Sequence, residues 1–203
     1  MLDIKKCHDD LTGTMLVGMK NLLFAQMRSR KLGGIATTKQ YRMVTLPTGN
    51  YGIAFIDIDT LSDSHINQVF YAHSKIGNPD AGDFSADGIK FTPLKSAPNL
   101  QRFPTLWVKN DNGNELLYNG HGRPTSPGEE YDADEDDYYD RKVCTESKIL
   151  EYIHSKVGEN GTVEGTIHMF TERYPCRSCM GVLKEFVKLY QKINVTVYYE
   201  MKV

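Results

Sequence analysis

The chain has 203 residues, of which 40% are hydrophobic and 25% charged, and its formal net charge is −2. That is enough apolar material for a buried core, which excludes a disordered, collagen-like or low-complexity protein. The longest apolar stretch is six residues, 51–56, far short of the roughly 20 that a membrane span needs. We therefore expect a folded domain with no membrane segment and no signal peptide.

The N-terminal part predicts one helix and one hairpin. Apolar residues at three- and four-residue spacing predict an amphipathic helix over 14–30. Residues 51–59 and 68–76 are rich in Ile, Phe, Tyr and Val, with turn-forming residues between them, and are typical of two paired strands.

The middle of the chain is dominated by turn-forming and acidic residues. Gly, Pro, Asn, Asp and Ser over 77–104 predict a loop, and 105–109 and 115–118 flank an Asn-Gly turn typical of a second hairpin. Residues 129–140 hold eight acidic and no basic residues, so the remainder, with 24 basic and 18 acidic residues, carries +6. We interpret this segment as a solvated linker; a gate that repels nucleic acid and a dock for a basic inhibitor are the alternatives.

Beyond the acidic segment, helices and strands alternate. Periodicity predicts a helix that begins near Cys144, a strand over 163–169, a helix that begins near Cys176 and a strand over 193–199. This order predicts an α/β fold, in which at least part of a mixed β-sheet is parallel and helices are packed on it.

The cysteines point to metal or redox chemistry, with a redox dithiol as the alternative for Cys176 and Cys179. There are too few for a disulfide framework, because Cys7 stands alone and only Cys144, Cys176 and Cys179 share the last third. A helix N-terminus favours the thiolate that binds zinc, and Cys176 and Cys179 are about one helical turn apart. Three thiolates would leave zinc an open position for water, and Glu146 is the candidate for moving protons.

The motif C-x-E at 144–146, followed by P-C-x-x-C at 175–179, resembles the signature of the zinc-dependent cytidine deaminase superfamily, in its variant with three cysteines. Residues 141–153 (RKVCTESKILEYI) and 171–186 (TERYPCRSCMGVLKEF) more narrowly resemble the BURPS668_1122-like deaminase domains of bacterial polymorphic toxins. The stretches GNYGIAFIDID and FYAHSKI are also similar to that group. The resemblance covers residues 49–200.

The resemblance implies a cytidine deaminase-like fold, an α-β-α sandwich, over residues 46–203. Residues 1–45 before it are not matched to this group, and the apolar spacing predicts that they form a helical segment. It implies that Cys144, Cys176 and Cys179 hold Zn²⁺ and that Glu146 carries a proton to the base. The implied reaction is hydrolytic deamination of cytosine to uracil.

The resemblance also implies a delivered toxin that acts in the target-cell cytoplasm. Its substrate would be nucleic acid, either single- or double-stranded DNA or RNA, and a cognate immunity protein would be its partner. His73, Ser74, Pro175 and Arg177 are candidate substrate contacts. Each has a simpler structural reading: packing for the histidine and its neighbour, a fixed backbone angle for the proline, and a solvated charge for the arginine.

Two other functions remain open from the residues. One is a deaminase of free cytidine or nucleotides, which would need a pocket closed around one base. The other belongs to a different class, a zinc-stabilised binding module, in which the C-x-x-C pair is structural and Glu146 only stabilises the helix dipole.

Overall fold

The structure is a computed structural model. It describes residues 1–38, 40–41, 49–61, 67–74, 76, 79, 82–96, 102–103, 107–109, 116–118, 144–175 and 177–201. The predicted acidic linker at 129–140 and the Asn-Gly turn at 112–113 lie outside these residues, and so does Cys176.

Seven strands form the main sheet in the order β1-β9-β8-β2-β3-β5-β4. Their bounds are β1 Leu2–Lys6, β2 Tyr51–Ile58, β3 Gln68–His73, β4 Phe84–Ala86, β5 Ile89–Pro93, β8 Gly165–Arg173 and β9 Ile193–Met201. The helices are α1 Leu11–Leu32, α4 Thr145–Val157 and α5 Arg177–Leu189. A separate antiparallel pair is made by β6 Trp107–Lys109 and β7 Leu116–Tyr118.

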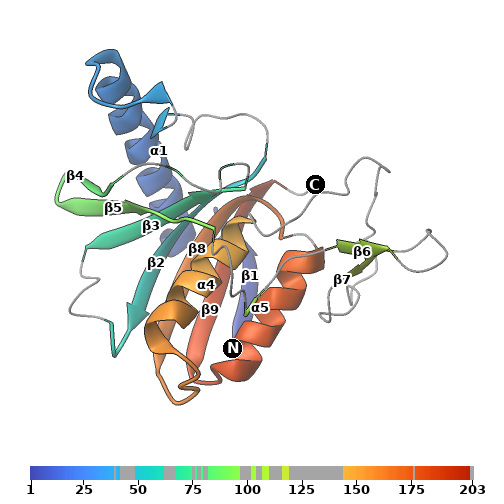
Figure 1. Ribbon diagram of the computed structural model, residues 1–203. Helices are drawn as coiled ribbons and strands as arrows, with labels where there is room; N and C mark the ends of the chain where they lie inside the picture. The colour runs from blue at the N-terminus through green and yellow to red at the C-terminus, as the bar shows by residue number, and fades with distance from the viewer. Residues whose placement is uncertain are drawn as a thin grey trace.

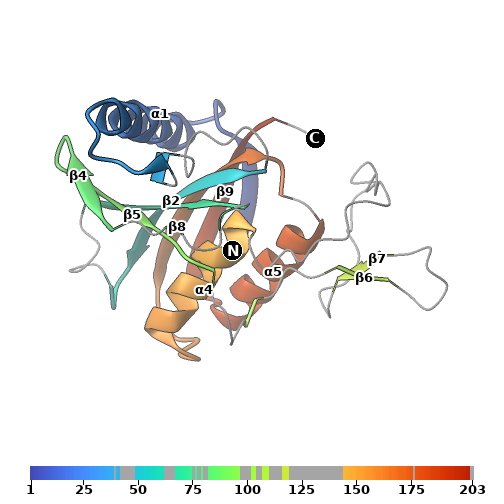
Figure 2. The same ribbon diagram turned by 45° about the horizontal axis from the view of Figure 1, so that its top comes forward.

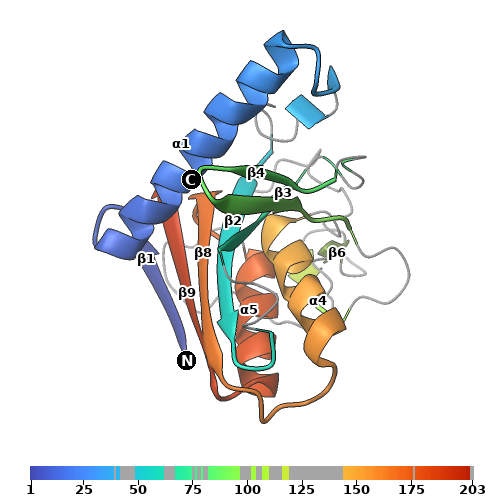
Figure 3. The ribbon, with the colours of Figure 1, turned by 90° about the vertical axis from the view of Figure 1, so that its left-hand side faces the viewer.

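Helices cover both faces of the sheet. Figures 1 and 2 show α4 and α5 together on one face and α1 on the other, and Figure 3 shows the sheet nearly edge-on between them. Each face has its own core: Ile149 and Phe186 belong to the α4–α5 core, and Leu16 and Leu23 to the α1 core. The predicted α/β fold, a mixed sheet with helices on both sides, is therefore confirmed.

The pairing of the predicted strands is confirmed as well. β2 and β3 are antiparallel neighbours, with Tyr51 opposite His73. β8 and β9 are parallel, as expected for two strands joined by the crossover helix α5. The second predicted hairpin is present as β6 and β7.

The prediction of a loop over 77–104 is wrong in part. Residues 84–93 form the hairpin of β4 and β5, which extends the sheet beyond β3. Asp87 and Gly88 have φ values of 52° and 76°. Two successive residues at positive φ make the turn that matches the twist of a two-stranded ribbon, and Asp-Gly is a preferred sequence for it.

The first 45 residues contribute more than the expected helix. β1 pairs in parallel with β9, and α1 begins at the N-cap Asp10, whose side chain accepts a hydrogen bond from Gly13 N at 2.9 Å. The boundary proposed at residue 45 stays a prediction. In the part of the chain with described coordinates, no helix has the length and apolarity to cross a membrane.

Candidate active site

The candidate site lies where α4 begins. Cys144 is the N-cap residue and is buried, and every residue from Thr145 to Glu151 is buried as well. The side chain of this N-cap residue makes no capping hydrogen bond. The first turn of α4 therefore lies in the interior, and the backbone N–H groups of a helix first turn favour a negatively charged group such as a thiolate.

A second helix begins at the same end of the sheet. α5 follows the end of β8 after a short connection (Figure 1). Pro175 in this connection and Cys179 in α5 are both buried. The ring of Tyr174 packs edge-on against Tyr199 of β9 at 5.0 Å between centroids, which fixes this connection to the sheet. α4 and α5 contact each other across one face.

The three-cysteine set is therefore described in part. Cys144 and Cys179 are both buried near the starts of two adjacent helices, and neither forms a disulfide with another described cysteine. Cys176 and the side chain of Arg177 lie outside the described residues. Among the side chains that the structure places, no three of His, Cys, Asp or Glu cluster closely enough to hold a metal ion, so the set that includes Cys176 stays a prediction.

Glu146 is buried, with only 2% of its surface exposed. The hydroxyl of Thr145 donates a hydrogen bond to Glu146 Oε2 at 2.9 Å, and Asn50 Nδ2 donates to Thr145 Oγ1 at 3.1 Å. A carboxylate removed from water is held in place only where donors compensate its lost hydration. This environment differs from that of a solvated glutamate in a helix first turn.

Asn50 joins several strand ends to this helix start. Its backbone N–H donates to Ser74 Oγ at 2.7 Å, and its carbonyl accepts from Ser74 N at 2.8 Å. Its side chain donates to Thr171 Oγ1 on β8 and accepts from Arg173 N at 3.2 Å. The ends of β3 and β8 and the start of β2 thus meet α4 through one residue, whose backbone bonds Ser74 and whose side chain bonds Thr145, Thr171 and Arg173.

The predicted substrate contacts His73 and Ser74 lie beside the same helix turn. His73 ends β3 and is 1% exposed, and its carbonyl accepts a hydrogen bond from Lys148 Nζ at 2.7 Å. Ser74 is half-buried and is tied to Asn50. The structure therefore brings both residues next to α4, while their role toward a substrate stays a prediction.

Lys148 is a buried lysine that sequence reasoning missed. It is 1% exposed, and its ammonium donates to the carbonyls of His73 and Ile76, each at 2.7 Å. Burial lowers the pKa of Lys148 to about 8, and the opposite effect of nearby Cys144 only partly offsets this. The lysine anchors the end of β3 to α4 and brings positive charge close to Cys144.

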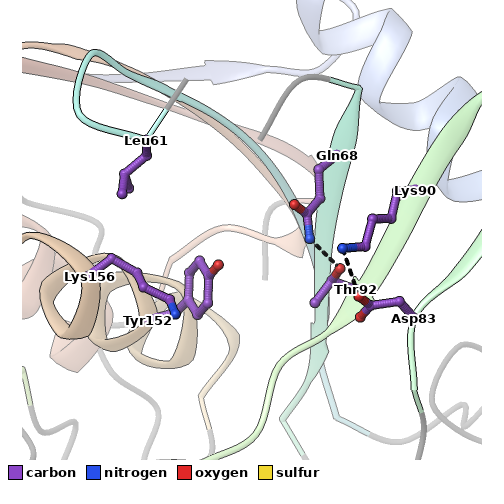
Figure 4. A pocket seen from close by; sticks show the side chains of 7 residues that line it. All are labelled: Leu61, Gln68, Asp83, Lys90, Thr92, Tyr152 and Lys156. Carbon is purple, nitrogen blue, oxygen red and sulfur yellow. Dashed lines mark hydrogen bonds and ion pairs between the residues drawn. The ribbon is translucent and has the colours of Figure 1, made fainter. Parts of the chain in front are cut away.

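A surface cavity of about 320 Å³ lies elsewhere. It is lined by residues that include Tyr152 and Lys156 from the second half of α4, and Figure 4 shows its polar groups. Asp83 and Lys90 form an ion pair at 2.9 Å, and Gln68 donates to Thr92, so these groups satisfy one another. This cavity is not part of the candidate site, because that site surrounds the first turn of α4.

The mixed sheet with α4 and α5 on one face is consistent with a cytidine deaminase-like fold. Residues 125–201 match a family model described as the BURPS668_1122 family of deaminases, which supports a toxin-deaminase domain in this part of the chain. The matched segment contains α4, β8, α5 and β9. Neither the comparison with curated proteins nor that with solved structures finds a match.

Sequence reasoning missed Asn50 and Thr145 as site residues. Asn50 is 95 positions from Thr145 in the chain, so no local pattern connects them. The available signal was Gly52, a glycine within a strand, which often marks a close approach of another element. The structure shows that this element is the start of α4.

Proposed function

We propose that this protein is a zinc-dependent hydrolase that deaminates cytosine in nucleic acid. One observation carries the proposal. The Glu146 carboxylate is buried two residues after the buried Cys144, at the start of a helix that packs on α5, where Cys179 is buried. The family match supports a deaminase toxin domain.

The donor chemistry fits zinc. Cys144 and Cys179 are buried, each stands near a helix N-terminus that favours its thiolate, and the spacing adds Cys176 as the third ligand. A zinc ion bound there supplies a water whose pKa is lowered to about 7. The buried Lys148 adds a positive charge near a site rich in thiolates.

Glu146 would move the protons of the reaction. Water adds at C4 of cytosine, the bond between C4 and the amino nitrogen breaks, and ammonia leaves, which gives uracil. The carboxylate would take a proton from the water and deliver it to the base, a task that suits a buried, hydrogen-bonded acid.

The proposals for the substrate and for the partner protein rest on the family match and on the net charge of the chain outside residues 129–140. Outside residues 129–140 the chain carries +6, which favours contact with a polyanion. We place His73, Ser74, Pro175 and Arg177 at the nucleic acid, which is DNA or RNA. As a toxin, the protein would act in the cytoplasm of a target cell in interbacterial competition, and an immunity protein would inhibit it.

The test compares two buried glutamates on one helix. Zinc-loaded wild type, Glu146→Gln and Glu151→Gln are incubated with single-stranded DNA, duplex DNA, RNA and free cytidine, and uracil is measured. We expect Glu146→Gln to lose about 100- to 10,000-fold in rate, as for removal of a general acid–base group. Glu151→Gln should keep wild-type turnover, and metal analysis should find equal zinc in all three proteins.

Each other outcome has a defined meaning. Turnover of free cytidine alone would replace the nucleic-acid substrate with a nucleoside. A wild type that is inert on every substrate, together with unfolding when the metal is chelated, would favour a zinc-stabilised binding module. Equal activity of Glu146→Gln and wild type would exclude the assigned role of the carboxylate.

A further inference from the structure

Beside the candidate site, a chain of two hydrogen bonds ends on the Glu146 carboxylate. It runs from Asn50 Nδ2 to Thr145 Oγ1 at 3.1 Å, and from the Thr145 hydroxyl to Glu146 Oε2 at 2.9 Å. We propose that Thr145 and Asn50 are positioning residues that hold this carboxylate in its reactive orientation. The inference rests on the proposed function, because it gives Glu146 a reacting partner.

The donor and the acceptor in each of these two hydrogen bonds are defined. The single hydroxyl proton of Thr145 is donated to Glu146 Oε2, and the hydroxyl oxygen accepts from Asn50 Nδ2. The amide of Asn50 has only one orientation that fits, because the backbone N–H of Arg173 donates to its Oδ1 at 3.2 Å. The NH₂ group therefore faces Thr145.

The Thr145 side chain has no room to turn. It is completely buried, and a Cβ added at Gly52 would lie 3.0 Å from Thr145 Cβ and 3.3 Å from its Cγ2. The threonine thus sits directly against the backbone of β2. A β-branched side chain is also stiff at χ1, so packing of the methyl group fixes where the hydroxyl points.

Asn50 ties the Thr145 side chain to the sheet. Its backbone exchanges hydrogen bonds with Ser74, and its side chain also binds Thr171, so it is held by β3 and β8 at once. A glutamate has three side-chain torsions and is costly to order, and small misplacements of a reacting group reduce rates steeply. The sheet, through Asn50 and Thr145, therefore limits the freedom of the carboxylate.

The experiment distinguishes the effect of the Thr145 hydroxyl group from the effect of its branched side-chain shape. Thr145→Val keeps the branched shape and removes the hydroxyl, whereas Thr145→Ser keeps the hydroxyl. We expect kcat of Thr145→Val to fall about 10- to 100-fold with KM within about twofold, and Thr145→Ser to recover most of the loss. Ser147→Ala is the control, since it removes a buried hydroxyl of the same helix that donates to Phe103 O instead.

A second measurement does not depend on turnover. Crystal structures of wild type and Thr145→Ser should show one Glu146 rotamer, and that of Thr145→Val should show a displaced or multiple rotamer. Unchanged kcat or an unmoved Glu146 carboxylate in Thr145→Val would overturn the inference. Inactivity of wild type on every substrate would refute the proposed function and, with it, the catalytic role given to this orientation.

Discussion

The contact between Gly52 and Thr145 predicts opposite effects for the same substitution at two glycines. At Gly52 an alanine methyl group would lie 3.0 Å and 3.3 Å from Thr145 atoms and 3.3 Å from Phe170 O. Favourable carbon contacts lie at about 3.5–4.0 Å, so either β2 or the start of α4 must shift. At Gly18, within α1, an added Cβ meets nothing within 4 Å.

The magnitudes follow from these distances. Overpacking of a well-filled site costs about 1–3 kcal/mol, so Gly52→Ala should lower the free energy of unfolding by that amount. Gly18→Ala should raise it by about 1 kcal/mol, because alanine is the better helix former and nothing obstructs the methyl group. The two variants should therefore differ by roughly 2–4 kcal/mol, or about 4–16 °C in Tm for a domain of this size.

Urea unfolding of wild type, Gly52→Ala and Gly18→Ala, followed by circular dichroism, measures this difference. The denaturant slope should be the same in all three proteins, so that the midpoints alone report stability. A Gly52→Ala protein as stable as wild type would refute the close approach of α4 to β2. Equal destabilisation by both substitutions would show that the loss is not specific to the Thr145 contact.

Two further predictions concern stability. Asp10→Ala should lower the free energy of unfolding by about 1–2 kcal/mol, because it removes the N-cap bond from Gly13 and the bond from Tyr198 Oη at 3.0 Å. The Gly13 N–H lowers the pKa of Asp10 below 3.8, so this stabilisation is present above that pH and is lost as the pH falls through the lower folded-state pKa. Urea titrations at several acidic pH values test this, and an equal midpoint for the variant at neutral pH would contradict it. Burial raises the pKa of Glu151 above 4.5, so its ionisation destabilises the fold as the pH rises through the interval between 4.5 and the folded-state pKa. Glu151→Gln keeps an acceptor for Phe103 N and should gain stability relative to wild type across that interval, whereas Glu185→Gln on α5 is the control; a pH-independent difference would refute the assignment.

The sequence predicted the elements that carry regular periodicity. The helix-strand-helix-strand order after residue 143 and the β2–β3 hairpin are confirmed, because their apolar residues repeat at the helical or strand period. β1 and the β4–β5 hairpin were not predicted. Five- and three-residue strands are too short to show a clear period, and their place depends on partners far along the chain.

Only those site residues could be predicted whose type suits metal binding or acid–base chemistry. Cys144, Glu146 and Cys179 were chosen for their ligand and acid-base properties, and the structure buries all three. Asn50, Thr145 and Lys148 act through shape and hydrogen bonds across the sheet. Polar residues of this kind are normally expected at the surface, so a local pattern does not distinguish a buried anchor from a solvated side chain.

The position of β9 has a consequence for how the protein is made. β9 lies inside the sheet, between β1 and β8, so β1 has no neighbour in the main sheet until residues 193–201 have been synthesised. Pairings between distant parts of a chain slow folding, since the long intervening segment must first be closed. A ribosome-bound chain that stops short of β9 therefore lacks a completed sheet, and we expect the enzyme to become active only after translation has passed this strand.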